Sequence, residues 1–292
     1  MAGAPRAGHR RTRNLAVLGL LPFFLFVALF LLLPGFTVFA RALTGQPGKG
    51  FSLSGMIDAT QGQYRKSFIA SFRLSFITAT LGGIIGTMLA YAVITLGRPR
   101  WLRTVVTAFS GVAANLGGVP LAFMFVAALG VQGLVTKLLN GAGVDLRQKG
   151  FTIFSFTGLV VVYLYFQIPL MLIVMAPAID GLRKEWREAA ANLGASAFQF
   201  WWRIGLRILA PSALGGFLLL FANAFSAYAT AYALTSGQGN LVSTQIDFIL
   251  RGNIIVGEDY FGYALAAWMI IIIAIAVLLN LMLQRRTARW LR

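Results

Sequence analysis

Six long apolar segments decide what this chain can fold into. We predict them at residues 15–40, 68–96, 104–130, 152–179, 208–235 and 260–283. Each is longer than the roughly 20 residues that a helix needs to cross the hydrocarbon core of a bilayer. Helices of this kind satisfy every backbone N–H and C=O group where no water is present. The sequence therefore predicts an all-α, polytopic membrane protein with six transmembrane helices.

The composition supports lipid as the main solvent. Hydrophobic residues make up 58% of the 292 residues and charged residues 11%, against about 45–50% and about 25% in soluble domains. No core of a chain this long hides so much apolar surface from water, which excludes a soluble globular protein. Disordered chains are poor in apolar residues, so disorder is excluded as well.

The positive charges predict an orientation. The net charge is +17, and Lys and Arg are about twice as frequent in the segments on the N-terminal side of the membrane as in the opposite loops. Cytoplasmic loops carry such an excess, so we expect both termini in the cytoplasm. The basic character then needs no nucleic acid as a partner. The first apolar segment is too long for the core of a signal peptide, and we expect it to be retained.

The residues of several familiar active sites are missing. The chain has no Cys, and its single His, His9, lies in the basic N-terminal segment, so we predict no metal site. It holds no Walker-type phosphate loop and neither of the common zinc-hydrolase and serine-hydrolase motifs, so we expect no enzyme. The acidic residues lie in loops or at span ends, which argues against proton coupling. A sodium-coupled carrier that uses backbone carbonyls remains an alternative.

Residues 180–207 form the most informative segment. We predict a short helix over residues 185–194, because its alanines favour helix and Gly194 suits a helix C-terminus. A second helix, rich in aromatic residues, is predicted over residues 195–203. The pair would present small side chains to a groove on another protein. The alternative is an amphipathic connector whose aromatic residues anchor it at the lipid interface.

The spacing within this segment resembles the signature of type I ABC importer permeases. That signature is Glu-Ala-Ala, three residues, Gly, nine residues, and then Ile-x-Leu-Pro. Arg207 stands where the signature has proline. The resemblance extends over about residues 68–283. The matching residues are Glu188, Ala189, Ala190, Gly194, Ile204 and Leu206.

The resemblance implies a coupling helix at residues 188–194 that sits in a groove of an ATP-binding subunit. Glu188 would pair with an Arg or Lys across that interface. The implied partners are two ATP-binding subunits, a second permease subunit that is identical or different, and an external solute-binding protein. ATP and Mg²⁺ would bind to the ATP-binding subunits, and this chain would bind no cofactor. The implied location is the inner membrane of a bacterium.

The resemblance also divides the chain into four parts. Residues 1–14 would form a basic cytoplasmic tail, and residues 15–67 the first transmembrane helix with an outer loop. Residues 68–283 would form the permease core of five transmembrane helices, including the coupling segment 180–207. Residues 284–292 would form a second basic cytoplasmic tail.

Four polar side chains at membrane depth are candidates for the translocation path: Asn115, Gln167, Asn223 and Tyr228. Hydrogen bonds between helices explain such residues equally well. Gly82 and Gly86 form a Gly-x-x-x-Gly pair that would let another helix approach the second span closely, or they are simply small residues in a dense bundle.

The cargo is predicted from two further stretches. Residues 165–169 and 223–228 look similar to the polyamine, iron, thiamine and phosphonate branch of these importers. The resemblance implies import of a polyamine-like solute, with a sugar or another small solute as the alternative. A secondary carrier or channel that needs no ATPase is the alternative class of function.

Overall fold

The computed structural model describes residues 20–44, 50–95, 99–237, 240–251 and 259–288. These residues are helical or irregular and contain no β-strand. The elements in chain order are the π-helix η1 (Ala28–Leu32), α2 (Leu33–Thr44), α3 (Ser54–Asp58), α4 (Gly62–Thr95), α5 (Arg100–Asn115), α6 (Gly118–Leu129), α7 (Leu134–Gly141), α8 (Phe156–Asp180), α9 (Lys184–Asn192), α10 (Ala197–Phe200), the π-helix η2 (Trp201–Gly205), α11 (Leu206–Ser226), α12 (Ala229–Thr235), α13 (Val242–Leu250) and α14 (Asp259–Ala288).

Six described helical segments are long and apolar enough to cross a membrane. This confirms the all-α class and the number of predicted spans. The first, second, fourth and sixth agree with the prediction to within a few residues, and residues 15–19 of the predicted first span lie outside the described part. The six segments are Leu20–Thr44, Gly62–Thr95, Gly118–Gly141, Phe156–Asp180, Ala197–Ser226 and Tyr260–Arg285.

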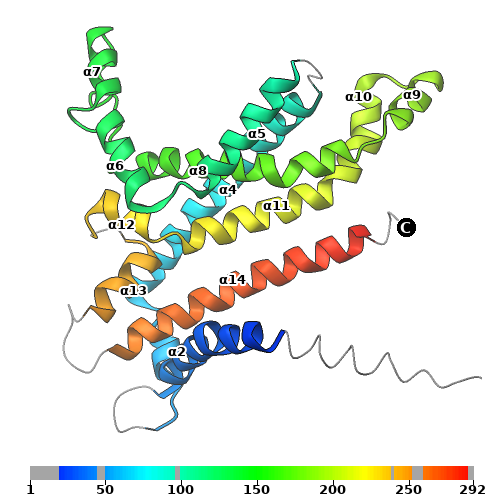
Figure 1. Ribbon diagram of the computed structural model, residues 1–292. Helices are drawn as coiled ribbons and strands as arrows, with labels where there is room; N and C mark the ends of the chain where they lie inside the picture. Colours follow the sequence, from blue (N-terminus) through cyan, green and yellow to red (C-terminus); the bar gives the residue numbers. More distant parts are fainter. Residues whose placement is uncertain (1–19, 45–49, 96–98, 238–239, 252–258, 289–292) are drawn as a thin grey trace, which may run out of the picture.

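The helices α4, α8 and α11 pack against one another at the centre of the bundle (Figure 1). α14 lies between α11 and α2, and α5 packs against α8. α9 and α10 project at one end, which we call the α9 end, whereas α12 and α13 lie at the opposite end, the α13 end. α6 and α7 extend away from the centre as an arm.

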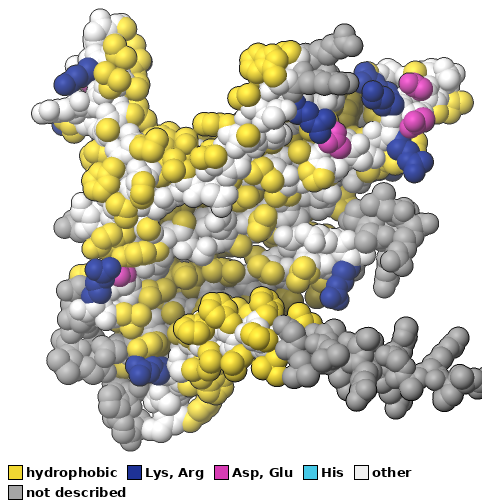
Figure 2. Space-filling model, in the orientation of Figure 1, with side chains coloured by type: hydrophobic (Ala, Val, Ile, Leu, Met, Phe, Trp, Pro, Cys, Tyr) yellow, Lys and Arg dark blue, Asp and Glu magenta, His cyan; other side chains and the backbone are white. Residues whose placement is uncertain are grey.

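Charged and hydrophobic side chains occupy different parts of the molecule. Figure 2 shows the described charged side chains gathered toward the two ends of the visible face, with hydrophobic side chains across the middle. Large apolar side chains are widely exposed, for example Phe30 at 68% and Phe36 at 71%. Lipid is the solvent that tolerates such a surface, as the apolar segments predicted.

The third and fifth predicted spans are wrong in their bounds, because each apolar segment is broken into two helices. In the segment 104–130, α5 ends at Asn115 and α6 begins at Gly118, which has φ +75°. Glycine adopts this left-handed backbone without strain, so the chain changes direction there. In the segment 208–235, α11 ends at Ser226 and α12 begins at Ala229.

The Gly-x-x-x-Gly pair of α4 does bring a second helix close. A Cβ on Gly82 would lie 2.8 Å from the Cβ of Gln167, and one on Gly86 would lie 2.7 Å from the backbone oxygen of Ile168. Both neighbours belong to α8. The two glycines therefore allow α4 and α8 to approach more closely than larger residues would permit.

Candidate functional site

The segment between α8 and α11 forms an exposed helical hairpin at the α9 end (Figure 1). α9 has Arg183 as its N-cap and Glu185 in its first turn, where the helix dipole favours a negative charge. Glu188 and Ala189 are exposed, whereas Ala190 is only 7% exposed. The outer side of α9 therefore combines a carboxylate with a small side chain, which another protein can approach closely.

Gly194 ends α9 in a Schellman motif. The N–H of Gly194 donates to the oxygen of Ala191 at 2.9 Å, and the N–H of Ala195 donates to the oxygen of Ala190 at 2.9 Å. Gly194 has φ +77° and no side chain or backbone close to the position of a Cβ. The sharp turn therefore depends on the backbone freedom of glycine, as the sequence predicted.

The second helix of the hairpin was predicted to end at Arg203, and this prediction is wrong. This helix begins with a capping box, in which the N–H of Gln199 donates to the Ser196 hydroxyl at 3.2 Å and Gln199 Oε1 accepts from the N–H of Ser196 at 2.9 Å. The helix then continues through α10, η2 and α11 to Ser226. Arg207, which stands where the signature has proline, lies inside this helix, and the helix also passes through Pro211.

Ile204 and Leu206 lie away from the tip of the hairpin. Ile204 is half-buried in η2, and Leu206 is 49% exposed at the start of α11. They therefore belong to the base of the hairpin, whereas Glu188, Ala189 and Gly194 belong to its exposed part.

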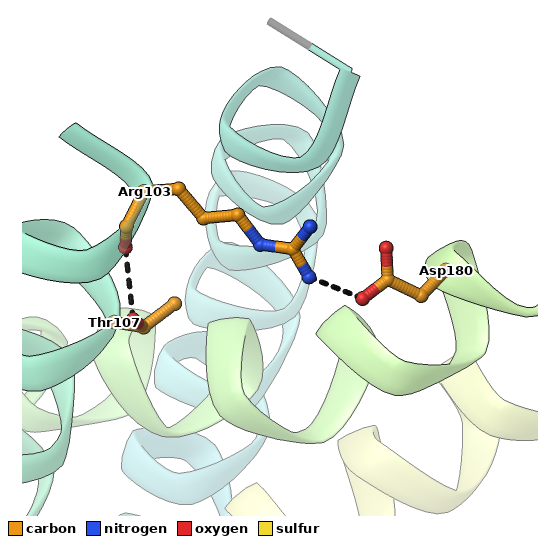
Figure 3. Close-up of polar contacts among 3 residues, drawn as sticks. All are labelled: Arg103, Thr107 and Asp180. Carbon is orange, nitrogen blue, oxygen red and sulfur yellow. Dashed lines mark hydrogen bonds and ion pairs between the residues drawn. The ribbon is translucent and has the colours of Figure 1, made fainter. Parts of the chain in front are cut away.

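Two contacts at this base were missed by the sequence analysis. The ring of Trp201 lies over Gly205, and it packs edge-on against Tyr91 of α4 with 5.0 Å between the ring centroids. Arg103 of α5 forms an ion pair with Asp180, the last residue of α8 (Figure 3). The Trp201–Tyr91 and Arg103–Asp180 contacts join residues far apart in the chain, and no local spacing signals them.

The interruption between α5 and α6 contacts the one between α11 and α12. The N–H of Gly118 donates to the hydroxyl of Thr230 at 2.8 Å, and this hydroxyl donates to the oxygen of Gly118 at 3.3 Å. At the second interruption, the hydroxyl of Tyr163 donates to the oxygen of Ala227 at 3.0 Å. Side chains thus replace helical bonds that the interruptions remove, as non-helical backbone at membrane depth requires.

Three of the four predicted path residues lie near these interruptions. Asn115 is exposed at the end of α5, where its Nδ2 donates to the oxygen of Gly111 at 2.8 Å. Asn223 is half-buried in the last turn of α11, and Tyr228 is half-buried at the N-cap of α12.

Tyr228 also touches a charged pair. Nε of Arg251 donates to Asp247 at 2.7 Å, and its Nη2 donates to the Tyr228 hydroxyl at 3.4 Å. The hydrogen bond to Asp247 and the charge of that carboxylate raise the pKa of Arg251 above its ordinary value. The charge of the Asp247 carboxylate is therefore balanced by the Arg251 guanidinium beside it.

Gln167 is fully buried and lies between three helices. Its Nε2 donates to the oxygen of Leu220 in α11 at 3.0 Å and to the hydroxyl of Thr78 in α4 at 3.4 Å. This is the bonding expected of a helix–helix contact. Its place in a translocation path remains a prediction.

Two adjoining cavities open at the α13 end, and Asn240 lines both. One has a volume of about 600 Å³, and the other, of about 510 Å³, is lined by Lys66. The hydroxyl of Ser67 donates to Oδ1 of Asn240 at 2.6 Å. Among the described residues, no carboxylate lines either cavity, and no cluster of His, Asp and Glu could hold a metal ion. The further lining residues are Gly62, Gln63, Gln245, Ala70, Phe154, Phe156, Leu159, Leu234, Thr235, Ser236 and Leu241.

Curated relatives include several permeases. The chain is 22% identical to the probable sulfate transport system permease protein cysT of Prototheca wickerhamii over 211 residues, which cover 71% of this chain and 78% of the relative. It is 26% identical to the spermidine/putrescine transport system permease protein PotB of Haemophilus influenzae over 153 residues, which cover 51% of each chain.

Solved structures show the same fold. A chain of a bacterial ABC transporter involved in the import of the acidic polysaccharide alginate matches with a TM-score of 0.68 and 19% identity, covering 98% of this chain and 99% of that chain. A chain of the bacterial alginate ABC transporter in complex with an alginate pentasaccharide-bound periplasmic protein matches with a TM-score of 0.70 and 18% identity, covering 98% of both.

The family itself is shown by a match along most of the sequence. The family model described as "Binding-protein-dependent transport system inner membrane component" matches residues 82–289, well over half of the chain. The match covers the hairpin, both helix interruptions and the last span. The chain therefore belongs to the binding-protein-dependent transport system inner membrane components, as a multi-pass permease subunit of an ABC importer that is not itself catalytic.

Proposed function

We propose that ATP-binding subunits drive this permease by binding α9 in a groove on their surface. The exposed outer side of α9, with Glu188 and Ala189 ahead of the Gly194 turn, carries the proposal. A groove on a partner can receive the small side chains, and an Arg or Lys in that groove can form a charge-assisted hydrogen bond with Glu188. The sequence has no phosphate-binding loop, so ATP and Mg²⁺ belong to the partners.

The proposed assembly has two permease subunits, two ATP-binding subunits and an external solute-binding protein. The α9 end and both termini face the cytoplasm in this proposal, because the segments on that side carry the larger share of Lys and Arg. The α13 end, with its two cavities, then faces the binding protein. The alginate transporter structure, which includes a periplasmic protein, supports such an arrangement.

The first candidate cargo is a polyamine-like solute, as the sequence resemblance implies. The relative named for spermidine and putrescine supports it. The second candidate is sulfate, which several relatives are named for. A local observation favours this second candidate: the described lining of the two cavities holds Lys66 and no carboxylate, and Asp247 is paired with Arg251.

The test is reconstitution with the partners encoded beside this chain. We expect the permease to co-purify with an ATP-binding subunit, and transport in proteoliposomes to require ATP and the loaded binding protein. Transport by this chain alone, without ATP, would instead identify a secondary carrier or channel. Calorimetric titration of the binding protein with spermidine and with sulfate then assigns the cargo.

A further inference from the structure

Arg103 and Asp180 connect two helices beside the hairpin. Nη2 of Arg103, in the first turn of α5, pairs with Oδ2 of Asp180, the residue that ends α8 (Figure 3). Only three residues separate Asp180 from α9, which begins at Lys184. The connection is short and internally bonded, since the N–H of Leu182 donates to the oxygen of Ile179 at 3.1 Å. A displacement of α9 therefore acts directly on Asp180.

The other end of α5 lies at the joint between the interrupted helices. α5 has 16 residues, which at 1.5 Å per residue gives a rod of about 24 Å. It ends at Asn115, three residues before Gly118, whose backbone is bonded by Thr230 of α12. α5 also packs along α8. One rigid element thus runs from the ion pair at the α9 end to the joint.

The ion pair contributes little to folding stability. The side chains of Arg103 and Asp180 are 48% and 44% exposed, and exposed pairs are weak because water screens them. Among the described residues, the other ion pair, Arg251 with Asp247, lies within one helical turn and joins no two elements. The Arg103–Asp180 pair instead links α5 to the residue at the base of the hairpin.

We propose that the Arg103–Asp180 ion pair is the link through which movement of α9 reaches α5 and, through α5, the joint of Gly118 and Thr230. Both are positioning residues, which touch neither the cargo nor ATP. The inference rests on the proposed function of α9 as the element that the ATP-binding subunits bind. It adds a route by which movement of the bound α9 changes the arrangement of the interrupted helices.

The test measures ATP hydrolysis of the complete complex with and without the loaded binding protein. In R103Q and in D180N we expect normal assembly and basal hydrolysis, but a stimulation reduced by about fivefold or more, the lower end of typical allosteric couplings. R285Q is the matched control, because Arg285 is exposed and lies in the last turn of α14, outside α5, α8 and the hairpin. This control should keep full stimulation. Full stimulation in R103Q and D180N would overturn the proposal.

The charge swap R103D/D180R distinguishes an effect of the ion pair from separate effects of Arg103 and Asp180. Because the swap restores opposite charges across the same gap, we expect the double variant to recover most of the stimulation that either single variant loses. Recovery is not expected of two side chains that act independently. A double variant no better than the poorer single one would overturn the link.

A second measurement does not depend on the proposed function. The chain has no Cys, so spin labels can be placed uniquely with V105C and L193C, at side chains that are 53% and 87% exposed. In the free permease in lipid nanodiscs, R103Q should broaden the distance distribution between the labels, and R285Q should not. An unchanged distribution in R103Q overturns the link. If ATP-driven transport is absent in the unaltered complex, the proposed function fails, and this distance measurement still tests the link.

Discussion

The hydroxyl of Thr230 bonds both backbone groups of Gly118. It accepts the N–H at 2.8 Å and donates to the oxygen at 3.3 Å. Gly118 begins α6 and Thr230 lies in the first turn of α12, so one side chain closes the interruption of a helix more than a hundred residues away. Thr230 is only 3% exposed. The joint therefore relies on this hydroxyl rather than on water.

Thr230→Val tests the joint. Valine has nearly the same shape, but it leaves the N–H of Gly118 without its partner, which costs about 1–3 kcal/mol for a buried group. We expect a lower melting temperature of the detergent-purified protein, followed by intrinsic fluorescence. Thr230→Ser retains the hydroxyl and should stay closer to the unaltered protein. Equal stability of the Val variant and the original would show that the bond contributes nothing to the fold.

Gly86→Ala tests the close approach of α4 and α8. The new Cβ would lie 2.5 Å from the Cβ of Met171 and 2.7 Å from the oxygen of Ile168. Because the second neighbour is backbone, relief requires the helices to separate, and overpacking of this kind costs about 1–3 kcal/mol. We expect a lower melting temperature and less protein extracted from the membrane.

The matched control is Gly83→Ala, on the same helix. No atom lies within 4 Å of a Cβ at Gly83, and alanine favours helix over glycine by up to about 1 kcal/mol. Stability should be unchanged or slightly higher. A similar loss in both variants would mean that the drop reflects α4 in general and not its contact with α8.

The number of spans could be predicted from the sequence, but the helix interruptions could not. A span needs about 20 consecutive apolar residues, and such a stretch can be recognised from the local composition alone. Whether Gly117 and Gly118 interrupt a helix depends on partners for the freed backbone groups. Those partners are Thr230 and, at the second interruption, Tyr163, which local spacing does not reveal.

In the hairpin, too, one feature could be predicted from the sequence and others could not. Gly194 predicted the end of α9, because a left-handed residue is required within the turn itself. The base of the hairpin was not predicted, since Trp201 meets Tyr91 and Arg103 meets Asp180 only after α4, α5 and α8 have packed. The expected end of the second helix was wrong because its backbone hydrogen bonds continue from α10 through η2 into α11, which also contains Pro211 without ending there.

Gly194→Ala tests the turn. A residue with a Cβ at φ +77° is strained by about 1–2 kcal/mol, although no neighbouring atom would clash. We expect faster hydrogen exchange of the amides in the last turn of α9, and weaker stimulation of ATP hydrolysis in the complex. Gly181→Ala is the control, because Gly181 has φ −71° and a Cβ there makes ordinary contacts. If both variants exchange alike, the conformation of Gly194 is not what holds the turn.

Glu188→Lys tests the proposed docking of α9. Glu188 is exposed on a helix that lies outside the candidate spans, so the variant should insert into the membrane in normal amount. A lysine would face the basic residue proposed on the ATP-binding subunit, and like charges across an interface oppose association. We expect loss of cargo-stimulated ATP hydrolysis in the purified complex. Asp58→Lys makes the same change of charge in α3, at the opposite end, and should co-purify with the ATP-binding subunit in larger amount than Glu188→Lys, which separates the position from the net charge. Full stimulation in Glu188→Lys would remove Glu188 from the coupling interface.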